Sequence, residues 1–363
     1  MVGVEDKTQE IGALAYRKWL EAMEDPVRVV YPDGRVVYEN EALRRLSRRF
    51  SKETSAPFPI ELSRPVFDEG VTDQTDFCLD RTVFSVTSSP VKEGSETVAA
   101  IQVFRDITRR DHLTQALYGD NQRMQEEMRF ARSIQEEMLP VLTAFGPLRF
   151  SYRYLPSHEL SGDFFDLVPL GRGRLALYIS DVVGHGVSAS ILTMFVRQSM
   201  RAILKEEKIA QPTNVLASLM RRFKEISGSD SQYFTLFYAV FDMQNRQVTY
   251  ANAGHNCPPL LKRQGSVQAL EARGMIISPL FSHHVYEQHQ IDFYPQDRFL
   301  FYTDGATEAR NRQGEAFGQA HLEGLLRDQN EDLLDGIAEE IGRFSQGKVR
   351  DDIALLQVDC LHW

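Results

Sequence analysis

The strongest constraint on how this chain folds is the stretch LALYISDVVGHGVSAS, residues 175–190. It begins with small and apolar residues that are typical of a buried strand. The apolar run ends at Asp181, and after a glycine-rich turn the residues from Val187 to Met200 have helical spacing. Glycine permits backbone conformations and close approaches that other residues do not. The pattern predicts one carboxylate held rigidly at the end of a sheet, although a helix-capping acid in a tight turn would have the same sequence.

Three other acids have a similar setting. Asp163 lies in SGDFFD, Asp304 follows the apolar run FLFYT and precedes glycine, and Asp351 opens DDIALLQV just before the last apolar run. One acid at a strand end is ordinary, but four such places suggest carboxylates that converge. Hard divalent cations prefer oxygen ligands of this kind. The residues therefore predict a site for divalent metal ions.

Five motifs follow one another along the chain: SGDFFD, SDVVGHG, NAGH, YTDGATEARN and DDIALL. In this order they resemble the SpoIIE/RsbU-type bacterial phosphatases, which belong to the metal-dependent type 2C protein phosphatases. The resemblance covers roughly residues 130–358 and includes ARSIQEEMLP, which is similar to the family's entry helix. It implies an αββα sandwich, in which helices cover both outer faces of two packed antiparallel sheets.

The resemblance assigns roles to particular residues. Asp181 would bridge two Mn²⁺ or Mg²⁺ ions, with the carbonyl of Val182 as a backbone ligand. Asp163 would serve one metal ion, whereas Asp304 and Asp351 would serve the other. Two such ions can bind phosphate oxygens, lower the pKa of a bridging water and stabilise the leaving oxygen. The four aspartates are therefore the predicted catalytic set, and no nucleophilic side chain is needed.

Other acids and two histidines lie in the same motifs. Asp166 and Asp352 are predicted to support hydrogen bonds or to be solvated, and Glu308 to start a helix instead of binding metal. Eukaryotic relatives place a histidine two residues after the bridging acid, where this chain has valine. His185 is therefore not assigned as a proton donor, and His255 is predicted to have a structural role.

The residues before these motifs predict a second domain. Two β-branched runs flank a Pro-Asp-Gly turn at residues 32–34, which is a hairpin signal. Asn40 precedes a helical stretch as a predicted N-cap. A later pair of strands ends in FRDIT, residues 104–108. This order is similar to that of a PAS sensor domain over about residues 20–109.

The sequence does not identify a ligand for the PAS-like domain. No histidine occurs between residues 1 and 111, so the usual haem ligand is missing, and Cys78 is not in a photoactive flavin motif. A module used only for dimerisation and relay fits these residues, and so does a domain that binds an unknown small molecule.

A long polar segment, residues 111–139, predicts a helix between the two domains. Gly119, Asp120 and Glu127 interrupt its apolar seam, so a perfect coiled coil is not expected. We expect a parallel two-helix linker and a homodimer held through the PAS-like domain and this linker; a single amphipathic helix packed on its own domain is the alternative. The apolar seam consists of Leu113, Leu117, Met124, Ala131, Ile134 and Met138.

The predicted fold class is α+β, with four consecutive parts. An N-terminal helix, a PAS domain, a helical coiled-coil linker and a phosphatase domain are expected at residues 1–19, 20–109, 110–140 and 141–363. Beyond residue 148 the predicted strands and helices do not alternate regularly, which disfavours a doubly wound parallel sheet. Strands are expected at 148–155, 164–168, 174–180, 233–242, 247–253 and 299–302, and helices at 187–206, 214–225, 321–327 and 333–344.

Composition narrows the function. The net charge of −10 disfavours nucleic-acid binding, including the function of a metal-dependent nuclease. No apolar run reaches the ~20 residues that span a membrane, and the three cysteines show no metal-binding or disulfide spacing. A cytoplasmic location is therefore expected.

These observations predict a signal-regulated protein serine/threonine phosphatase. By resemblance, its substrate would be a phosphorylated anti-anti-sigma protein of the STAS fold, which implies partner switching. A non-catalytic PAS-containing scaffold with a phosphatase-like binding surface is the alternative. Metal-dependent hydrolysis of an aryl phosphate distinguishes the two.

Overall fold

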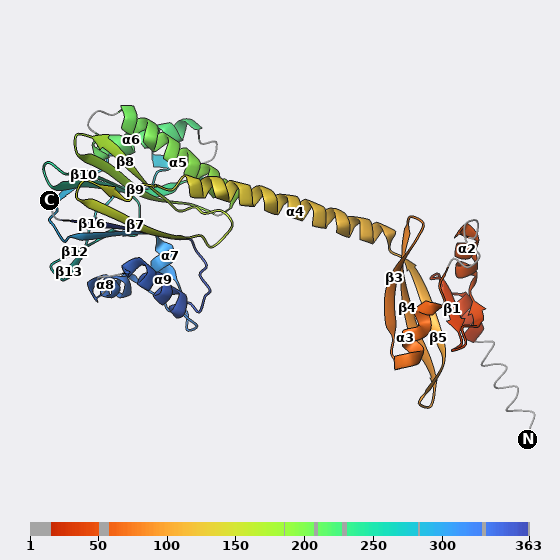
Figure 1. The fold of residues 1–363 in the computed structure, drawn as a ribbon. Helices are drawn as coiled ribbons and strands as arrows, with labels where there is room; N and C mark the ends of the chain where they lie inside the picture. The colour runs from red at the N-terminus through yellow and green to blue at the C-terminus, as the bar shows by residue number, and fades with distance from the viewer. Residues whose placement is uncertain are drawn as a thin grey trace, which may run out of the picture. The chain divides into compact units, whose positions relative to one another are not determined.

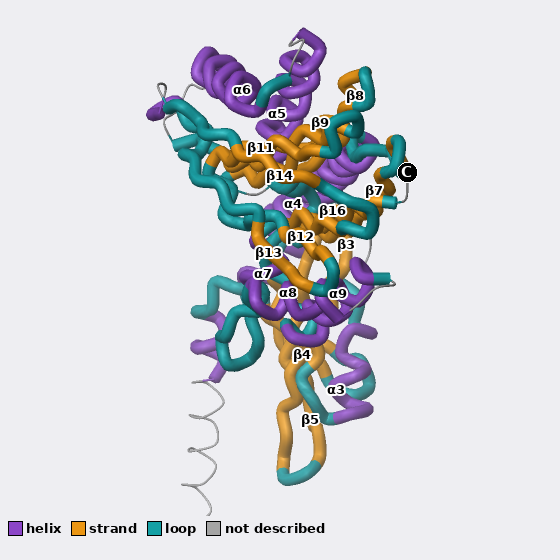
Figure 2. The backbone as a smooth tube through the Cα atoms, turned by 90° about the vertical axis from the view of Figure 1, so that its left-hand side faces the viewer, coloured by secondary structure: helices purple, strands orange, loops and turns teal. Residues whose placement is uncertain are grey.

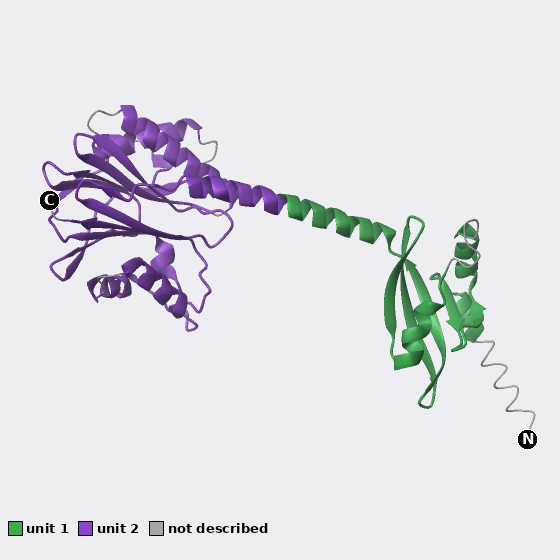
Figure 3. Cartoon of the chain, in the orientation of Figure 1, with its two compact units in different colours: residues 1–123 green, residues 124–363 purple. Residues whose placement is uncertain are grey.

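A computed structural model of the chain describes residues 16–50, 58–184, 186–206, 210–226, 231–281, 284–328 and 332–361. The chain divides into two compact units, residues 1–123 and residues 124–363 (Figure 3). Each unit has its own sheets and its own apolar core. Of the predicted N-terminal helix, residues 1–15 lie outside the described residues, and residues 16–21 are helical.

The first unit is built on one five-stranded antiparallel sheet with the spatial order β2-β1-β5-β4-β3. The predicted hairpin is present, and Asn40 caps the following helix by accepting the N–H of Leu43 at 3.0 Å. Phe58, Phe84 and Phe104 form the centre of its core. The elements are β1 (Val27–Val30), β2 (Val36–Glu39), α2 (Glu41–Phe50), η1 (Glu61–Ser63), α3 (Arg64–Glu69), β3 (Asp73–Leu79), β4 (Thr82–Glu93) and β5 (Glu96–Asp106).

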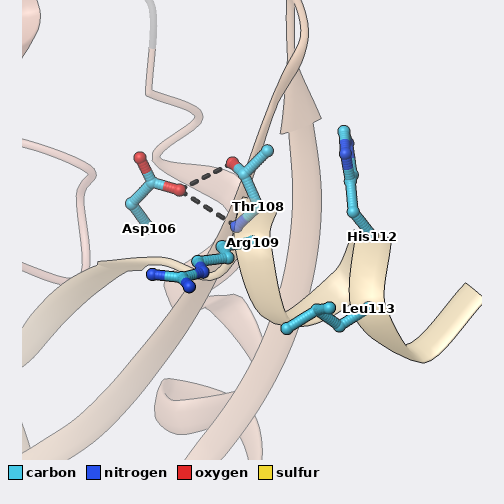
Figure 4. Close-up of a pocket in the computed structure, with 5 residues that line it drawn as sticks. All are labelled: Asp106, Thr108, Arg109, His112 and Leu113. Atoms are coloured by element: carbon cyan, nitrogen blue, oxygen red, sulfur yellow. Dashed lines mark hydrogen bonds between the residues drawn. The ribbon is translucent and has the colours of Figure 1, made fainter. Parts of the chain in front are cut away.

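The long helix α4 (Thr108–Glu137) begins directly after β5. Figure 4 shows how its first turn is fixed: the carboxylate of Asp106 accepts the N–H and the hydroxyl of Thr108, at 3.0 and 2.6 Å. A shallow pocket of about 700 Å³ lies beside this turn and is also lined by Arg109, His112 and Leu113. The Asp-Ile-Thr motif in the sequence therefore sets the start of the helix.

In α4 the apolar side chains of the predicted seam are exposed, whereas a polar side chain is buried. Leu113, Leu117 and Met124 of the predicted seam are 56, 70 and 59% exposed. The only buried residue of the helix is a polar one, Gln135. The first part of α4 therefore presents an uncovered apolar seam, whereas its last turns pack through Gln135.

The second unit has four layers (Figures 1 and 2). Helices α5 (Val187–Glu206) and α6 (Pro212–Ile226) cover one sheet, and α7 (Asp304–Glu308), α8 (Gln319–Asp328) and α9 (Leu333–Phe344) cover the other. The first sheet contains, in spatial order, β14 (His289–Asp292), β11 (Gln247–Ala253), β10 (Phe234–Asp242), β9 (Arg174–Val182) and β8 (Phe164–Gly171). The second contains β13 (Ser266–Ala269), β12 (Leu260–Arg263), β15 (Arg298–Tyr302), β16 (Ile353–Cys360), β7 (Leu148–Leu155) and β6 (Ala144–Phe145).

Every strand pairing in the described part of this unit is antiparallel, as the irregular order of elements predicts. The two sheets pack through aromatic side chains: the ring of Phe237 lies 6.1 Å from that of Phe301, and the ring of Phe241 lies 5.3 Å from that of Phe299. Burying one such side chain contributes roughly 1.5–3 kcal/mol. The predicted helices and strands of this unit are confirmed, with small differences at their ends. Among the described residues, no helix has the length and apolar character needed to cross a bilayer.

Candidate active site

The first sheet carries two of the predicted metal ligands. Asp163 directly precedes β8, and Asp181 is the penultimate residue of β9. These strands pair in antiparallel register, with Phe164 opposite Ser180. The register places Asp163 and Asp181 side by side at one end of the sheet.

The second sheet carries the other two. Asp304 is the first residue of α7, directly after the Tyr302-Thr303 end of β15, and Asp351 lies two residues before β16. The N–H of Thr303 donates to the carbonyl of Ala354 at 3.1 Å, which joins the end of β15 to the start of β16. Both acids therefore lie at one end of this sheet, and the charge of Asp304 acts directly on Asp181.

Two glycines let the acid-bearing loops approach these strands closely. A Cβ atom on Gly162 would lie 2.8 Å from the carbonyl oxygen of Val182, the predicted backbone ligand. A Cβ atom on Gly305 would lie only 1.9 Å from the carbonyl oxygen of Asp352. Any larger residue would push these loops away. The glycine beside Asp163 and the one beside Asp304 are thus part of how the acids are positioned.

The acids at this edge repel one another. Asp163 is 3% exposed, and burial followed by the charge of Asp181 raises its pKa well above the usual range. Burial, then Asp304 and Asp351, raise the pKa of Asp181 to about 7. Burial also raises the pKa of Asp351. Carboxylates behave in this way when they share a site without a cation.

The residues present fit divalent cations. Oδ2 of Asp163 is buried and accepts no hydrogen bond, although an unpaired buried oxygen of this kind is costly. The four acids offer oxygen donors, which are the ligands that Mn²⁺ and Mg²⁺ prefer. Within the described ranges, no three acidic, histidine or cysteine side chains form a ready-made metal cluster. The carboxylates are nevertheless close enough for Asp304 and Asp351 to raise the pKa of Asp181.

The two acids predicted to have supporting roles do so. Asp166 is fully buried and accepts two hydrogen bonds from Arg201, at 2.7 and 3.0 Å. Asp352 accepts the N–H groups of Ser157 and Gly162, at 2.7 and 2.9 Å. Asp352 therefore ties the Asp163 loop to the start of β16.

His255 has the structural role that the sequence predicts. Its Nε2 donates to the carbonyl of Tyr302 at 3.0 Å, and its N–H donates to Asn252 at 2.7 Å. Burial lowers its pKa to about 4, so the ring is neutral at pH 7. His185 lies outside the described residues. The prediction that Glu308 starts a helix is wrong, since Glu308 is the last residue of α7.

Sequence reasoning missed a contact from α4. The side-chain amide of Gln135 donates to the carbonyl of Ser161 at 2.7 Å and accepts its N–H at 3.1 Å. Ser161 Oγ in turn accepts the N–H of Asp163 at 3.1 Å. The last turns of α4 therefore hold the loop that carries a predicted metal ligand. The only signal was a glutamine on the apolar side of ARSIQEEMLP.

A cleft of about 800 Å³, also missed, opens beside Glu308 and Asp351. Basic residues from two loops line it, and these loops lie far apart in the sequence.

Comparisons with known proteins agree with this geometry. The family model described as Stage II sporulation protein E (SpoIIE) matches residues 171–361, which is more than half of the chain. Asp181, Asp304 and Asp351 lie within the match, and Asp163 precedes it.

Two curated relatives come from Bacillus subtilis (strain 168). The phosphoserine phosphatase RsbU is 23% identical over 339 residues, covering 89% of this chain and 98% of RsbU. The phosphoserine phosphatase RsbP is 27% identical over 223 residues, covering 59% of this chain, and the match spans only about half of RsbP, 52%. Among solved structures, the SiaA-PP2C domain of Pseudomonas aeruginosa has a TM-score of 0.59 at 19% identity, covering 66% of this chain and 97% of that domain. The last likeness shows a shared fold.

Proposed function

The chain belongs to the SpoIIE family of metal-dependent protein phosphatases, and we propose that it is a signal-regulated phosphatase that removes phosphate from serine or threonine of a regulatory protein. One observation carries the proposal: four aspartates lie at the ends of two packed sheets, where burial and neighbouring carboxylates raise the pKa of Asp163, Asp181 and Asp351, and Oδ2 of Asp163 has no hydrogen-bond partner. Nearby Asp166 differs, because Arg197 and Arg201 form ion pairs with its carboxylate.

The roles of the residues follow from their positions. Asp181 would be a ligand of both Mn²⁺ or Mg²⁺ ions, Asp163 and the carbonyl of Val182 would hold one of them, and Asp304 and Asp351 would hold the other. When bound, the two ions supply an acidic water and stabilise charge on the leaving oxygen. Asp163 and Asp181 are held at the ends of β8 and β9, so their carboxylates are fixed by the sheet.

The substrate and the control are proposed from the resemblance of the sequence motifs, and the phosphoserine phosphatase RsbU, which matches this chain over nearly its whole length, supports phosphoserine as the residue acted on. The substrate is a phosphorylated STAS-type anti-anti-sigma protein in the cytoplasm. The first unit is a PAS-like sensor, and the exposed seam of α4 with its Leu113 and Leu117 favours a homodimer through that unit and the linker. Light scattering of the full chain should give a dimer, and Leu117→Glu should weaken it.

The test uses the purified full chain, an aryl phosphate and phosphorylated STAS proteins. We expect hydrolysis of both that requires Mn²⁺ or Mg²⁺, and loss of more than nine tenths of the rate in Asp181→Asn. A tenfold loss corresponds to only ~1.4 kcal/mol of barrier. A wild-type chain that binds the STAS protein but never hydrolyses either substrate would favour the non-catalytic scaffold instead.

A further inference from the structure

The cleft that Asp351 lines carries mainly basic side chains, whereas the chain as a whole is acidic. The whole protein has 51 acidic and 41 basic residues, a net charge of −10. The cleft, about 800 Å³ in volume, is lined by four basic residues and by two acids, Glu308 and Asp351. The four basic residues are Arg310, Arg312, Lys348 and Arg350. A positive surface in an acidic protein favours an anionic ligand at this place.

The four basic residues of the cleft differ from other arginines of this unit in their partners. Among the residues that the structure describes, none of them forms an ion pair with a carboxylate, whereas Arg153, Arg201 and Arg263 of the same unit each do. Arg310 donates to the carbonyl of Gly314 at 2.7 Å, and Arg312 donates to Gln346. Neutral acceptors hold these guanidinium groups in place without removing their charge.

The loops that carry the cations are themselves ordered by hydrogen bonds. After α7, Arg310 pairs with Ala316 in an antiparallel bridge, and the side chain of Asn311 accepts the N–H groups of Gln313 and Glu315, both at 3.0 Å. After α9, Lys348 donates its N–H to Ser345 at 3.1 Å. The bond from Arg312 to Gln346 joins the two loops. A ligand would therefore meet positions that are already set, which lowers the cost of binding.

The place of the cleft indicates which anion it takes. Asp351 lines the cleft and belongs to the predicted metal set. If the phosphoserine of a substrate protein lies at the metal site, the substrate residues next to it would therefore lie in this cleft. The cleft is far larger than a phosphate ion, and guanidinium groups pair well with carboxylates.

We propose that this basic cleft binds the aspartate and glutamate side chains that flank the phosphoserine of the protein substrate, and so selects acidic phosphorylated segments. The inference rests on the proposed phosphatase function and adds its substrate class.

Two phosphoserine peptides test it on the full chain: one with aspartates at the flanking positions, and one with asparagines in their place. The variant is Arg312→Gln with Lys348→Gln, both exposed and neither a predicted metal ligand. The control is Arg149→Gln, an exposed residue near the opposite end of the β7–β16 pair. We expect wild type and control to prefer the acidic peptide at least fivefold in kcat/KM, and the variant to lose this preference. The preference should also shrink as salt is added.

Fluorescence anisotropy of the same two peptides, labelled, with the chain separates this inference from the function. Tighter binding of the acidic peptide that disappears in the double variant supports the cleft even if no turnover occurs. An active chain with equal kcat/KM for both peptides, or a preference that survives the double variant, overturns it.

Discussion

Asp163 and Asp166 lie three residues apart in one short segment and are both buried, yet their surroundings are opposite. Asp166 accepts two hydrogen bonds from Arg201 of α5 and a third, at 3.3 Å, from Tyr178 of β9. Asp163 faces other carboxylates and keeps one oxygen without a partner. A buried acid with its own cation supports the fold. A buried acid without one marks a site that a ligand completes.

The largest expected effect is a difference in kcat between two variants in which aspartate is replaced by asparagine, Asp163→Asn and Asp166→Asn. Asp163→Asn removes a ligand of the metal site, and we expect at least a hundredfold lower kcat with Mn²⁺. Asp166→Asn leaves that site intact, so its kcat should stay within about tenfold of wild type at a temperature where it is folded. Initial rates on an aryl phosphate across a Mn²⁺ titration measure both. Equal losses would mean that the two acids do not differ in function.

Without metal, the two substitutions should change the free energy of unfolding in opposite directions. Asp166→Asn weakens a charged hydrogen-bonded pair and should lower the free energy of unfolding by about 2 kcal/mol. Asp163→Asn removes repulsion among the acids and should raise it by roughly 1 kcal/mol. Urea unfolding in the presence of a chelator, followed by circular dichroism, measures the change. If Asp163→Asn also lowers the free energy of unfolding, repulsion among the carboxylates does not destabilise the folded chain.

The pH dependence of the metal-free protein sharpens the comparison further. The pKa of Asp181 is about 7 in the folded chain against an ordinary 3.8. Between these values the folded state binds a proton that the unfolded state does not, so the free energy of unfolding falls as pH rises, by at most ~1.4 kcal/mol per pH unit. From pH 5.5 to 7.5 wild type should lose roughly 1–2 kcal/mol more than Asp181→Asn. Parallel curves for the two proteins would contradict the raised pKa.

Much of this arrangement could be predicted from local sequence. The strand ends and the glycines are local features, and the bounds of β7, β11, α5 and α9 coincide with the predicted ones. The features that the sequence did not predict depend on contacts between residues far apart in the chain. Arg201 reaches Asp166 across 35 positions, and the two loops of the basic cleft are joined by the hydrogen bond from Arg312 to Gln346, across 34 positions. Strand β3 was also missed, since its alternating polar residues in Asp73–Leu79 resemble a loop.

The smallest effect concerns what holds Asp163 in its position. Gln135 from α4 makes two hydrogen bonds with the backbone of Ser161, whose Oγ accepts the N–H of Asp163. In Gln135→Ala both backbone groups of Ser161 lose a partner, and an unsatisfied buried group costs about 1–3 kcal/mol. The Asp163 loop should then sample other positions, so we expect kcat to fall several-fold and the Mn²⁺ concentration for half-maximal rate to rise.

The matched control is Gln125→Ala, an exposed glutamine on the same helix. It should leave both quantities unchanged. Because Asp166 is held by Arg201 and not by α4, the stability difference between Asp166→Asn and its parent should be the same with or without Gln135→Ala. The effect of Asp163→Asn should instead shrink in the Gln135→Ala background. A double-mutant cycle with no coupling between Gln135 and Asp163 would mean that α4 only rests on the catalytic unit, and that any signal passing along it acts elsewhere.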